Sequence, residues 1–175
     1  MTDRPTHPPG RLQLAVVGAA SCDGSLEALA RLVGRDVAAS GAVLLCGGRG
    51  GVMAAASAGA REAGGLVVGL LPGADATSTP PNPHLDVTLF TGLGQARNVV
   101  LTLSAHAVLA IGGGWGTLSE IAMALKQRIP VVLLESWDLV RPDGLVDPLL
   151  RQATSPHDAV EMAVRMGELR REGRT

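Results

Sequence analysis

Two stretches near the middle of the chain contain residue types that could act on a bound ligand. An apolar segment is followed by the run Gly112-Gly-Gly-Trp-Gly-Thr-Leu-Ser-Glu120. A carboxylate positioned beside a ligand can act as a general base, and this is one interpretation of Glu120. Thr117 followed three residues later by Glu120 is also the capping box that begins many helices, in which the carboxylate accepts a backbone N–H. The spacing alone leaves both interpretations open.

Arg97 is the second candidate for chemistry. The sequence predicts a helix over residues 94–104, which places Arg97 in its first turn. A cation there meets the positive end of the helix dipole, which is mildly unfavourable unless an anion or a carboxylate compensates. Arg97 is therefore either a residue that holds an anion or Glu120, or an ordinary solvated arginine.

Glycine-rich turns supply backbone that could bind phosphate. The run Cys46-Gly-Gly-Arg-Gly-Gly-Val52 and the run that begins at Gly112 each lie between an expected strand and an expected helix. Free N–H groups at a helix start favour an anion, and glycine lets it approach closely. Arg49 could reach the phosphate or could lie on the surface. The candidates for phosphate or nucleotide binding are Ser21, Gly48, Arg49, Gly50, Gly51, Met53, Gly113, Gly114, Trp115, Gly116 and Thr117.

Two common nucleotide-binding motifs are missing from the sequence. The first expected strand is followed by Gly18-Ala-Ala-Ser-Cys-Asp-Gly24 and not by the GxGxxG fingerprint of dinucleotide-binding proteins. The Gly-Lys-Ser/Thr of a P-loop occurs nowhere in the chain. The sequence therefore disfavours an NAD dehydrogenase and a Walker-type ATPase.

The elements that must position these residues alternate along the chain. Apolar runs predict strands over residues 12–18, 42–46, 66–71, 85–90, 106–111 and 131–134. Amphipathic segments predict helices over residues 26–39, 51–63, 94–104, 117–128 and 155–172. Strands that are apolar throughout and separated by helices indicate a parallel sheet covered on both faces.

We therefore expect an α/β protein with a Rossmann-like, three-layer, doubly wound parallel sheet. Residues 11–172 form its single domain, after a flexible tail over residues 1–10. Residues 74–84 form the one long loop expected, either a lid over the ligand or a tolerated proline-rich surface loop.

Composition limits the partners. The net charge is −1, and the only aromatic residues are one phenylalanine and two tryptophans. Neither nucleic acid nor a membrane surface is an expected partner, because both favour a strongly basic face, and single strands also need aromatic stacking. Cys22 and Cys46 lack CxxC spacing and are expected to be reduced thiols, which together with the absence of a secretory leader predicts a cytoplasmic protein without a metal site.

A family is recognisable in residues 92–134. This segment resembles the Lonely Guy (LOG) proteins and, more closely, the related molybdenum-cofactor carrier proteins. The LOG motif PGGxGTxxE corresponds to the run Gly112–Glu120, with glycine in place of proline. The family's arginine on the preceding helix corresponds to Arg97, and residues 47–53 resemble its second glycine-rich element.

The resemblance implies a nucleotide-binding Rossmann-like protein, usually a homodimer or higher homo-oligomer with its ligand near the interface. LOG enzymes are phosphoribohydrolases, which hydrolyse cytokinin riboside 5′-monophosphates to the free base and ribose 5-phosphate and need no cofactor. By this resemblance Glu120 would activate water or stabilise the sugar cation, as in other glycosidic hydrolysis, and Arg97 would hold Glu120 or the substrate. Residues 113–117 would bind the phosphate.

The neighbours of Arg97 depart from the LOG pattern, which has a histidine and an acidic residue before the arginine and a lysine after it. Gln95, Ala96 and Asn98 occupy this region here, as expected nearer the carrier branch. The retained Arg97–Glu120 pair favours the hydrolase. The alternatives are a non-catalytic carrier whose ligand is molybdenum cofactor or a related pterin nucleotide, and a nucleotide-sensing module. A lysine decarboxylase is rejected because Lys126, the only lysine, lies near the far end of its predicted helix.

Overall fold

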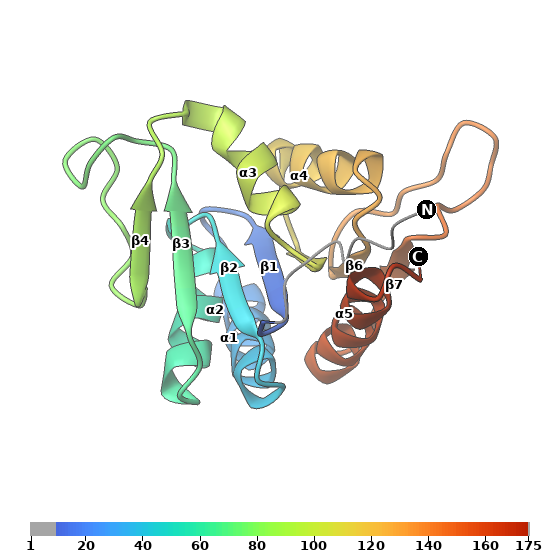
Figure 1. Ribbon diagram of the computed structural model, residues 1–175, viewed down its shortest axis with the longest axis horizontal. Helices are drawn as coiled ribbons and strands as arrows, with labels where there is room; N and C mark the ends of the chain where they lie inside the picture. Colours follow the sequence, from blue (N-terminus) through green and yellow to red (C-terminus); the bar gives the residue numbers. More distant parts are fainter. Residues whose placement is uncertain (1–9, 175) are drawn as a thin grey trace.

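The computed structural model describes residues 10–174 and contains one seven-stranded sheet in which every strand pair is parallel. The strand order is β4-β3-β2-β1-β5-β6-β7 (Figure 1). The strands are β1 (Gln13–Gly18), β2 (Val43–Cys46), β3 (Val67–Leu71), β4 (Val87–Phe90), β5 (Ala107–Ile111), β6 (Val131–Leu134) and β7 (Leu150–Gln152). The order reverses between β1 and β5, and ligands of open α/β sheets bind beyond the carboxyl ends of the strands at such a point.

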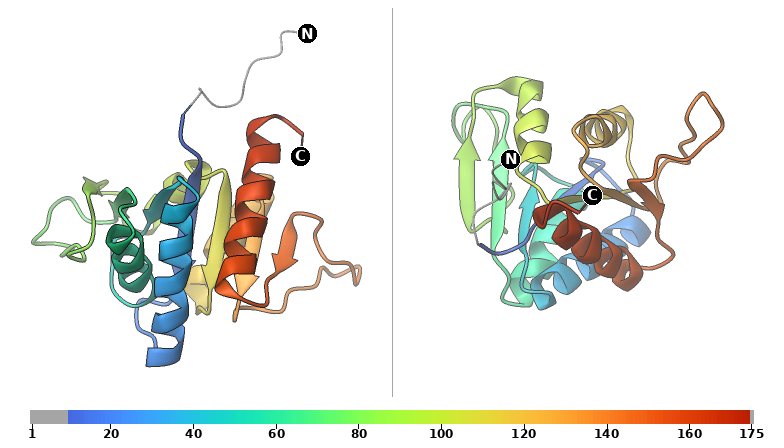
Figure 2. Two further views of the ribbon diagram at one scale, coloured as in Figure 1. Left: turned by 90° about the horizontal axis from the view of Figure 1, so that it is seen from below. Right: turned by 45° about the vertical axis from the view of Figure 1, so that its right-hand side comes forward.

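Helices cover both faces of the sheet, as a three-layer fold requires. They are α1 (Gly24–Ala39), α2 (Val52–Glu62), α3 (Arg97–Leu103), α4 (Trp115–Lys126) and α5 (Pro156–Arg171), and the short 3-10 turn η1 (Gly94–Ala96) leads into α3. The helices α1, α2 and α5 lie on one face, and α3 and α4 lie on the other (Figure 2). None of the described helices is long and apolar enough to cross a membrane.

Two apolar clusters hold the layers together. Alternate residues of a strand point to opposite faces, so Leu14 and Val16 of β1 join the cluster under α1, α2 and α5. Ala15 and Val17 join the cluster under α3 and α4, which contains Ile121. Because the central strands are buried on both faces, they read as continuous apolar runs, which is why the sequence predicted them well.

The Rossmann-like α/β fold, its six predicted strands and its five predicted helices are confirmed, with shifts of a few residues at their ends. Two expectations are wrong. The strand β7 was missed because it is short, and Arg151 and Gln152 in it are exposed. Residues 74–84 are not the only long loop, since residues 135–149 form a second one that extends from the sheet edge (Figure 1). Residues 1–9 of the expected tail lie outside the described residues.

Two glycines allow α1 and α2 to touch backbone to backbone. A Cβ added at Gly34 would overlap the carbonyl oxygen of Ala56, and one added at Gly59 would overlap that of Arg31. This contact sets the position of α2 and therefore of the glycine-rich loop that precedes it.

The contact between α1 and α2 predicts that replacing Gly34 by alanine destabilises the protein, although alanine usually stabilises a helix relative to glycine. Gly34→Ala should lower the free energy of unfolding by about 1–3 kcal/mol, because backbone must move to admit the methyl group. Gly24→Ala is the matched control, since a Cβ at Gly24 meets no atom within 4 Å. It should be neutral or stabilising, as alanine in helices usually is. Urea denaturation measures both, and equal stability of the two variants would contradict the assignment.

Candidate functional site

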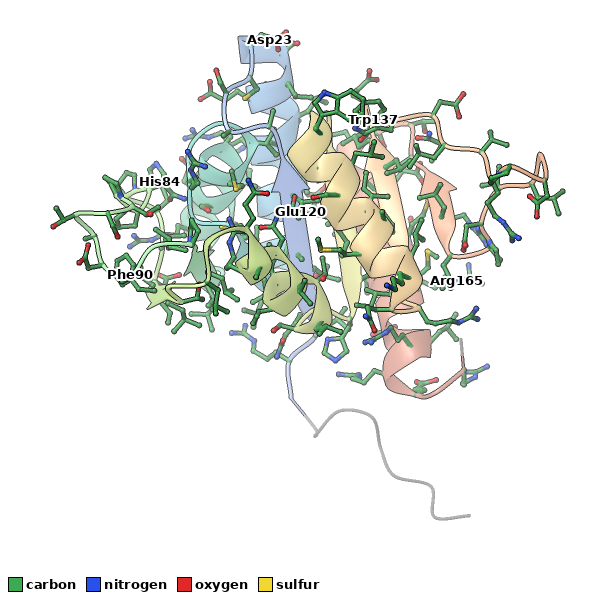
Figure 3. The ribbon with its side chains drawn as sticks, turned by 90° about the horizontal axis from the view of Figure 1, so that it is seen from above. Asp23, His84, Phe90, Glu120, Trp137 and Arg165 are labelled. Atoms are coloured by element: carbon green, nitrogen blue, oxygen red, sulfur yellow. The ribbon has the colours of Figure 1, made fainter. Side chains whose placement is uncertain are left out.

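A cavity of about 330 Å³ lies beyond the carboxyl end of β1, between the starts of α3 and α4. Figure 3 shows Glu120 between these two helices, above β1. The cavity is lined by Gly18, Ala19, Ala20, Arg49, Met53, Arg97, Asn98, Gly114, Gly116, Thr117 and Glu120. The reversal of strand order therefore brings together residues that are far apart in the sequence.

Arg97 and Glu120 form a buried ion pair in this cavity. The Arg97 side chain is 8% exposed and the Glu120 side chain 10%, with 3.8 Å between Nη1 of Arg97 and Oε1 of Glu120. This distance is too long for a hydrogen bond. Nε and Nη1 of Arg97 are buried and have no hydrogen-bond partner. Arg97 is thus the first residue of α3, as the expected first-turn position requires, but it is not a solvated arginine.

The glycine loop after β2 makes room for the guanidinium. A Cβ added at Gly47 would lie 2.7 Å from Nη1 of Arg97 and 2.8 Å from Sδ of Met53. Any larger residue at position 47 would displace one of these side chains. The glycine therefore lets Arg97 lie directly against the end of β2.

Burial changes the protonation of the pair. Desolvation raises the pKa of Glu120 to about 7, against the opposing effect of the Arg97 charge. Desolvation also lowers the pKa of Arg97, and the Glu120 carboxylate acts in the opposite direction. A carboxyl group that titrates near neutral pH can accept or donate a proton in a reaction.

The capping-box interpretation of Thr117 and Glu120 is wrong. The helix α4 begins at Trp115, after an N-cap Gly114 that makes no side-chain capping hydrogen bond. Gly112 and Gly113 adopt positive φ values of 54° and 118°, so the chain turns into the helix earlier than the Thr-x-x-Glu spacing suggests. Glu120 consequently lies one turn inside the helix, and the first N–H groups of α4 have no partner within the helix.

The loop between β2 and α2 is fixed from two sides. Val52 donates its N–H to the carbonyl of Ala19 over 3.1 Å, and Asn82 donates its own N–H to the carbonyl of Gly48 over 2.9 Å. The side-chain amide of Asn82 donates to the carbonyl of Arg49 over 3.2 Å. Part of the loop over residues 74–84 thus holds the glycine loop in place, and its action as a lid stays a prediction.

The structure separates the predicted site residues into groups. Arg49, Met53, Arg97, Gly114, Gly116, Thr117 and Glu120 line the cavity. Ser21 and Gly51 line a neighbouring cavity, and Gly48, Gly50 and Gly113 shape the loops. Trp115 is 80% exposed and lies beside Trp137, with 5.5 Å between ring centroids.

Sequence reasoning missed four of the lining positions. Gly18, Ala19 and Ala20 directly follow β1, and the carboxyl end of the first strand is the signal that could have identified them. Asn98 follows Arg97 in α3, and the departure from the LOG pattern next to this arginine is its only signal in the sequence. Lys126 is the last residue of α4, at the end away from the cavity, as predicted from its position in the sequence.

This arrangement defines a Rossmann-like domain with a cavity, lined by Arg49, Arg97 and Glu120, at the reversal of its strand order. The chain belongs to the SLOG cluster4 family, whose model matches residues 11–166. The resemblance to LOG-like and carrier proteins is thereby confirmed.

Three relatives illustrate the family. An uncharacterised protein of Archaeoglobus fulgidus is 38% identical over 153 residues, which cover 87% of this chain and 95% of the relative. The molybdenum cofactor binding protein of Rippkaea orientalis is 36% identical with a TM-score of 0.82, over 91% of this chain and 99% of that one. The molybdenum cofactor carrier protein of Chlamydomonas reinhardtii is 32% identical with a TM-score of 0.78, over 90% and 98%.

The raised pKa of Glu120 predicts a pH-dependent cost of folding. Its folded-state pKa of about 7 lies above the ordinary 4.5, so between these values the folded state holds a proton that the unfolded state has lost. The free energy of unfolding should therefore fall as pH rises through this window. Glu120→Gln cannot titrate, and its stability relative to the wild type should increase by up to about 3 kcal/mol from pH 4.5 to 7.

Urea denaturation at a series of pH values measures this difference. Glu161→Gln on the exposed surface of α5 controls for removal of a carboxylate as such. A stability difference between Glu120→Gln and the wild type that does not change with pH would contradict the assigned pKa.

Proposed function

We propose that this protein binds a phosphorylated pterin of the molybdenum-cofactor type and carries it without chemical change. The observation that carries the proposal is the buried Arg97, whose Nε and Nη1 lack hydrogen-bond partners inside a cavity of about 330 Å³. An unsatisfied buried guanidinium is costly, and a phosphate oxygen would supply the missing acceptors.

The remaining lining residues fit a phosphate. Gly114, Gly116 and Thr117 at the start of α4 offer backbone N–H groups and the positive end of the helix dipole. Arg49 adds a second positive charge to the lining. Two relatives that match this chain over nearly their whole length are described as a molybdenum cofactor binding protein and a molybdenum cofactor carrier protein, which supports a pterin as the rest of the ligand.

Hydrolysis of a nucleoside 5′-monophosphate is the second candidate function. The observation that favours it is Glu120, whose carboxyl titrates at about 7 beside Arg97. The C1′–N bond would break to leave an oxocarbenium-like sugar, and Glu120 would take a proton from a water molecule as the water oxygen bonds to C1′. That proton passes to the departing base, so the products are the free base and ribose 5-phosphate.

Replacement of Arg97 should weaken binding of the cofactor, and a control variant away from the cavity shows whether the loss is specific. Purified protein would be incubated with molybdenum cofactor released from a molybdoenzyme, passed through a desalting column, and assayed for retained pterin by fluorescence after oxidation. The wild type should retain the cofactor, and Arg97→Ala should retain at least about tenfold less, because a charge-assisted phosphate contact is lost. Arg165→Ala, on α5, is the control (Figure 3).

A parallel assay tests turnover. AMP and cytokinin ribotides would be incubated with the wild type and with Glu120→Gln, and free base measured by chromatography. The carrier function predicts no base from either protein. Base released by the wild type and not by Glu120→Gln would replace the carrier with the hydrolase.

We also propose that the protein forms a homodimer through α3 and the edge strand β4. The uncharged β4 exposes Val87, Leu89 and Phe90, and α3 exposes Val100 and Leu103. Such an apolar surface on a sheet edge is typical of an interface. Because α3 also carries Arg97, a second copy here would lie next to the candidate site.

A charge placed on this surface should dissociate the dimer. Leu103→Asp is expected to give monomer by light scattering, because the carboxylate would be desolvated at the interface. Leu32→Asp on α1 is the matched control, since Leu32 is 46% exposed and Leu103 45%. A monomeric wild type, or a dimer in Leu103→Asp, would overturn the proposed interface.

A further inference from the structure

A second cavity of about 280 Å³ adjoins the candidate site at the same edge of the sheet. It is lined by Ala20, Ser21, Cys22, Glu27, Arg31, Gly51, Ala54, Ala55, Ala58 and His84. Both cavities include Ala20, and the labels Asp23, His84 and Glu120 in Figure 3 mark three sides of this region. Together the two volumes fall in the range of about 300–1,000 Å³ that is usual for ligand sites.

The backbone of Gly51 and of residues 19–20 lies between the two cavities. Gly51, at the start of α2, packs so closely on residues 19–20 that a Cβ there would overlap the carbonyl of Ala19. No side chain rises from Gly51, and Ala20 contributes only a methyl group. A ligand held in the first cavity can therefore extend past this stretch of backbone into the second.

The two cavities differ in their charged side chains. The first is lined by Arg49, Arg97 and Glu120, whereas the second is lined by Glu27 and Arg31, and Arg31 is paired with Glu62. Burial raises the pKa of the Cys22 thiol, and the nearby carboxylates of Glu27 and Asp23 act in the same direction. A ligand with an anionic end and a hydrogen-bond-donating end would fit both.

Glu27 is a carboxylate acceptor that remains available in the second cavity. The Asp23 carboxylate already accepts the N–H of Leu26 over 2.9 Å as the N-cap of α1. The guanidinium of Arg31 is paired with the carboxylate of Glu62, with 3.1 Å between Nε and Oε2. The Glu27 carboxylate accepts no hydrogen bond and forms no salt bridge among residues 10–174.

We propose that the second cavity binds the heterocycle of the ligand, and that Glu27 selects the 2-aminopyrimidinone edge shared by pterins and guanine. This edge presents a ring N–H and an amino group side by side, which two carboxylate oxygens can accept together. Adenine presents an unprotonated ring nitrogen at the equivalent position, which a carboxylate repels. The assignment rests on the proposed function, because the phosphate at Arg97 is what aligns the ring with Glu27.

Calorimetry with GMP and AMP tests this selection, because the two nucleotides share the ribose phosphate and differ in the edge of the base. The wild type should bind GMP at least about tenfold more tightly than AMP. Glu27→Gln should remove most of this preference by weakening GMP while leaving AMP unchanged, since an amide offers only one acceptor. Glu161→Gln on α5 should behave as the wild type, and because Glu27 is exposed, its replacement should not impair folding.

Arg97→Ala in the same titrations distinguishes the two proposals. Equal affinities for GMP and AMP, both reduced in Arg97→Ala, would overturn the role of Glu27 and leave the phosphate site standing. A GMP preference that depends on Glu27 and not on Arg97 would support the heterocycle subsite and overturn the phosphate site. Absence of binding by either nucleotide would overturn both.

Discussion

The buried charge of Arg97 is the constraint on which the site depends. Moving a guanidinium out of water costs several kcal/mol, and the Glu120 carboxylate at 3.8 Å offsets only part of this cost. Burial in turn raises the pKa of Glu120, so the pair is not fully ionised near neutral pH. A cation held in this way is incompletely satisfied by the protein, and it gains most from an anion that enters the cavity. This incomplete satisfaction is the physical basis of the proposed binding function.

The parallel sheet makes this arrangement possible. Because the order of strands reverses at β1 and β5, α3 and α4 begin above the carboxyl ends of different strands and face one another across β1. One helix begins with the arginine, and the other begins after a run of glycines, with no side-chain cap on the N–H groups of its first turn. The site therefore needs no catalytic loop of its own. It arises where two helix starts and two glycine-rich turns meet at one edge of the sheet.

The opposite face of the sheet contributes through packing. The backbone contact between α1 and α2 at Gly34 and Gly59 determines where the first turns of both helices lie. Those turns border the second cavity, so its shape follows from helix packing under the sheet, while the first cavity follows from α3 and α4 above it. A ligand that spans both would contact all three layers along one edge. The proposed carrier and hydrolase functions would use this same edge and would differ in the role of Glu120.

The sequence by itself determined the layered α/β fold, because parallel strands that are buried on both faces are continuous apolar runs and are easy to recognise. It also determined that glycine-rich turns end those strands, and it singled out Arg97 and Glu120 as candidates for chemistry. Only the tertiary structure decided that α4 begins at Trp115, because positive φ at Gly112 and Gly113 is a property of the folded turn. It also decided that Arg97 is buried and that Ser21 belongs to a different cavity from Thr117. Burial and cavity membership depend on which distant segments meet, and this is set by packing between elements and not by local spacing.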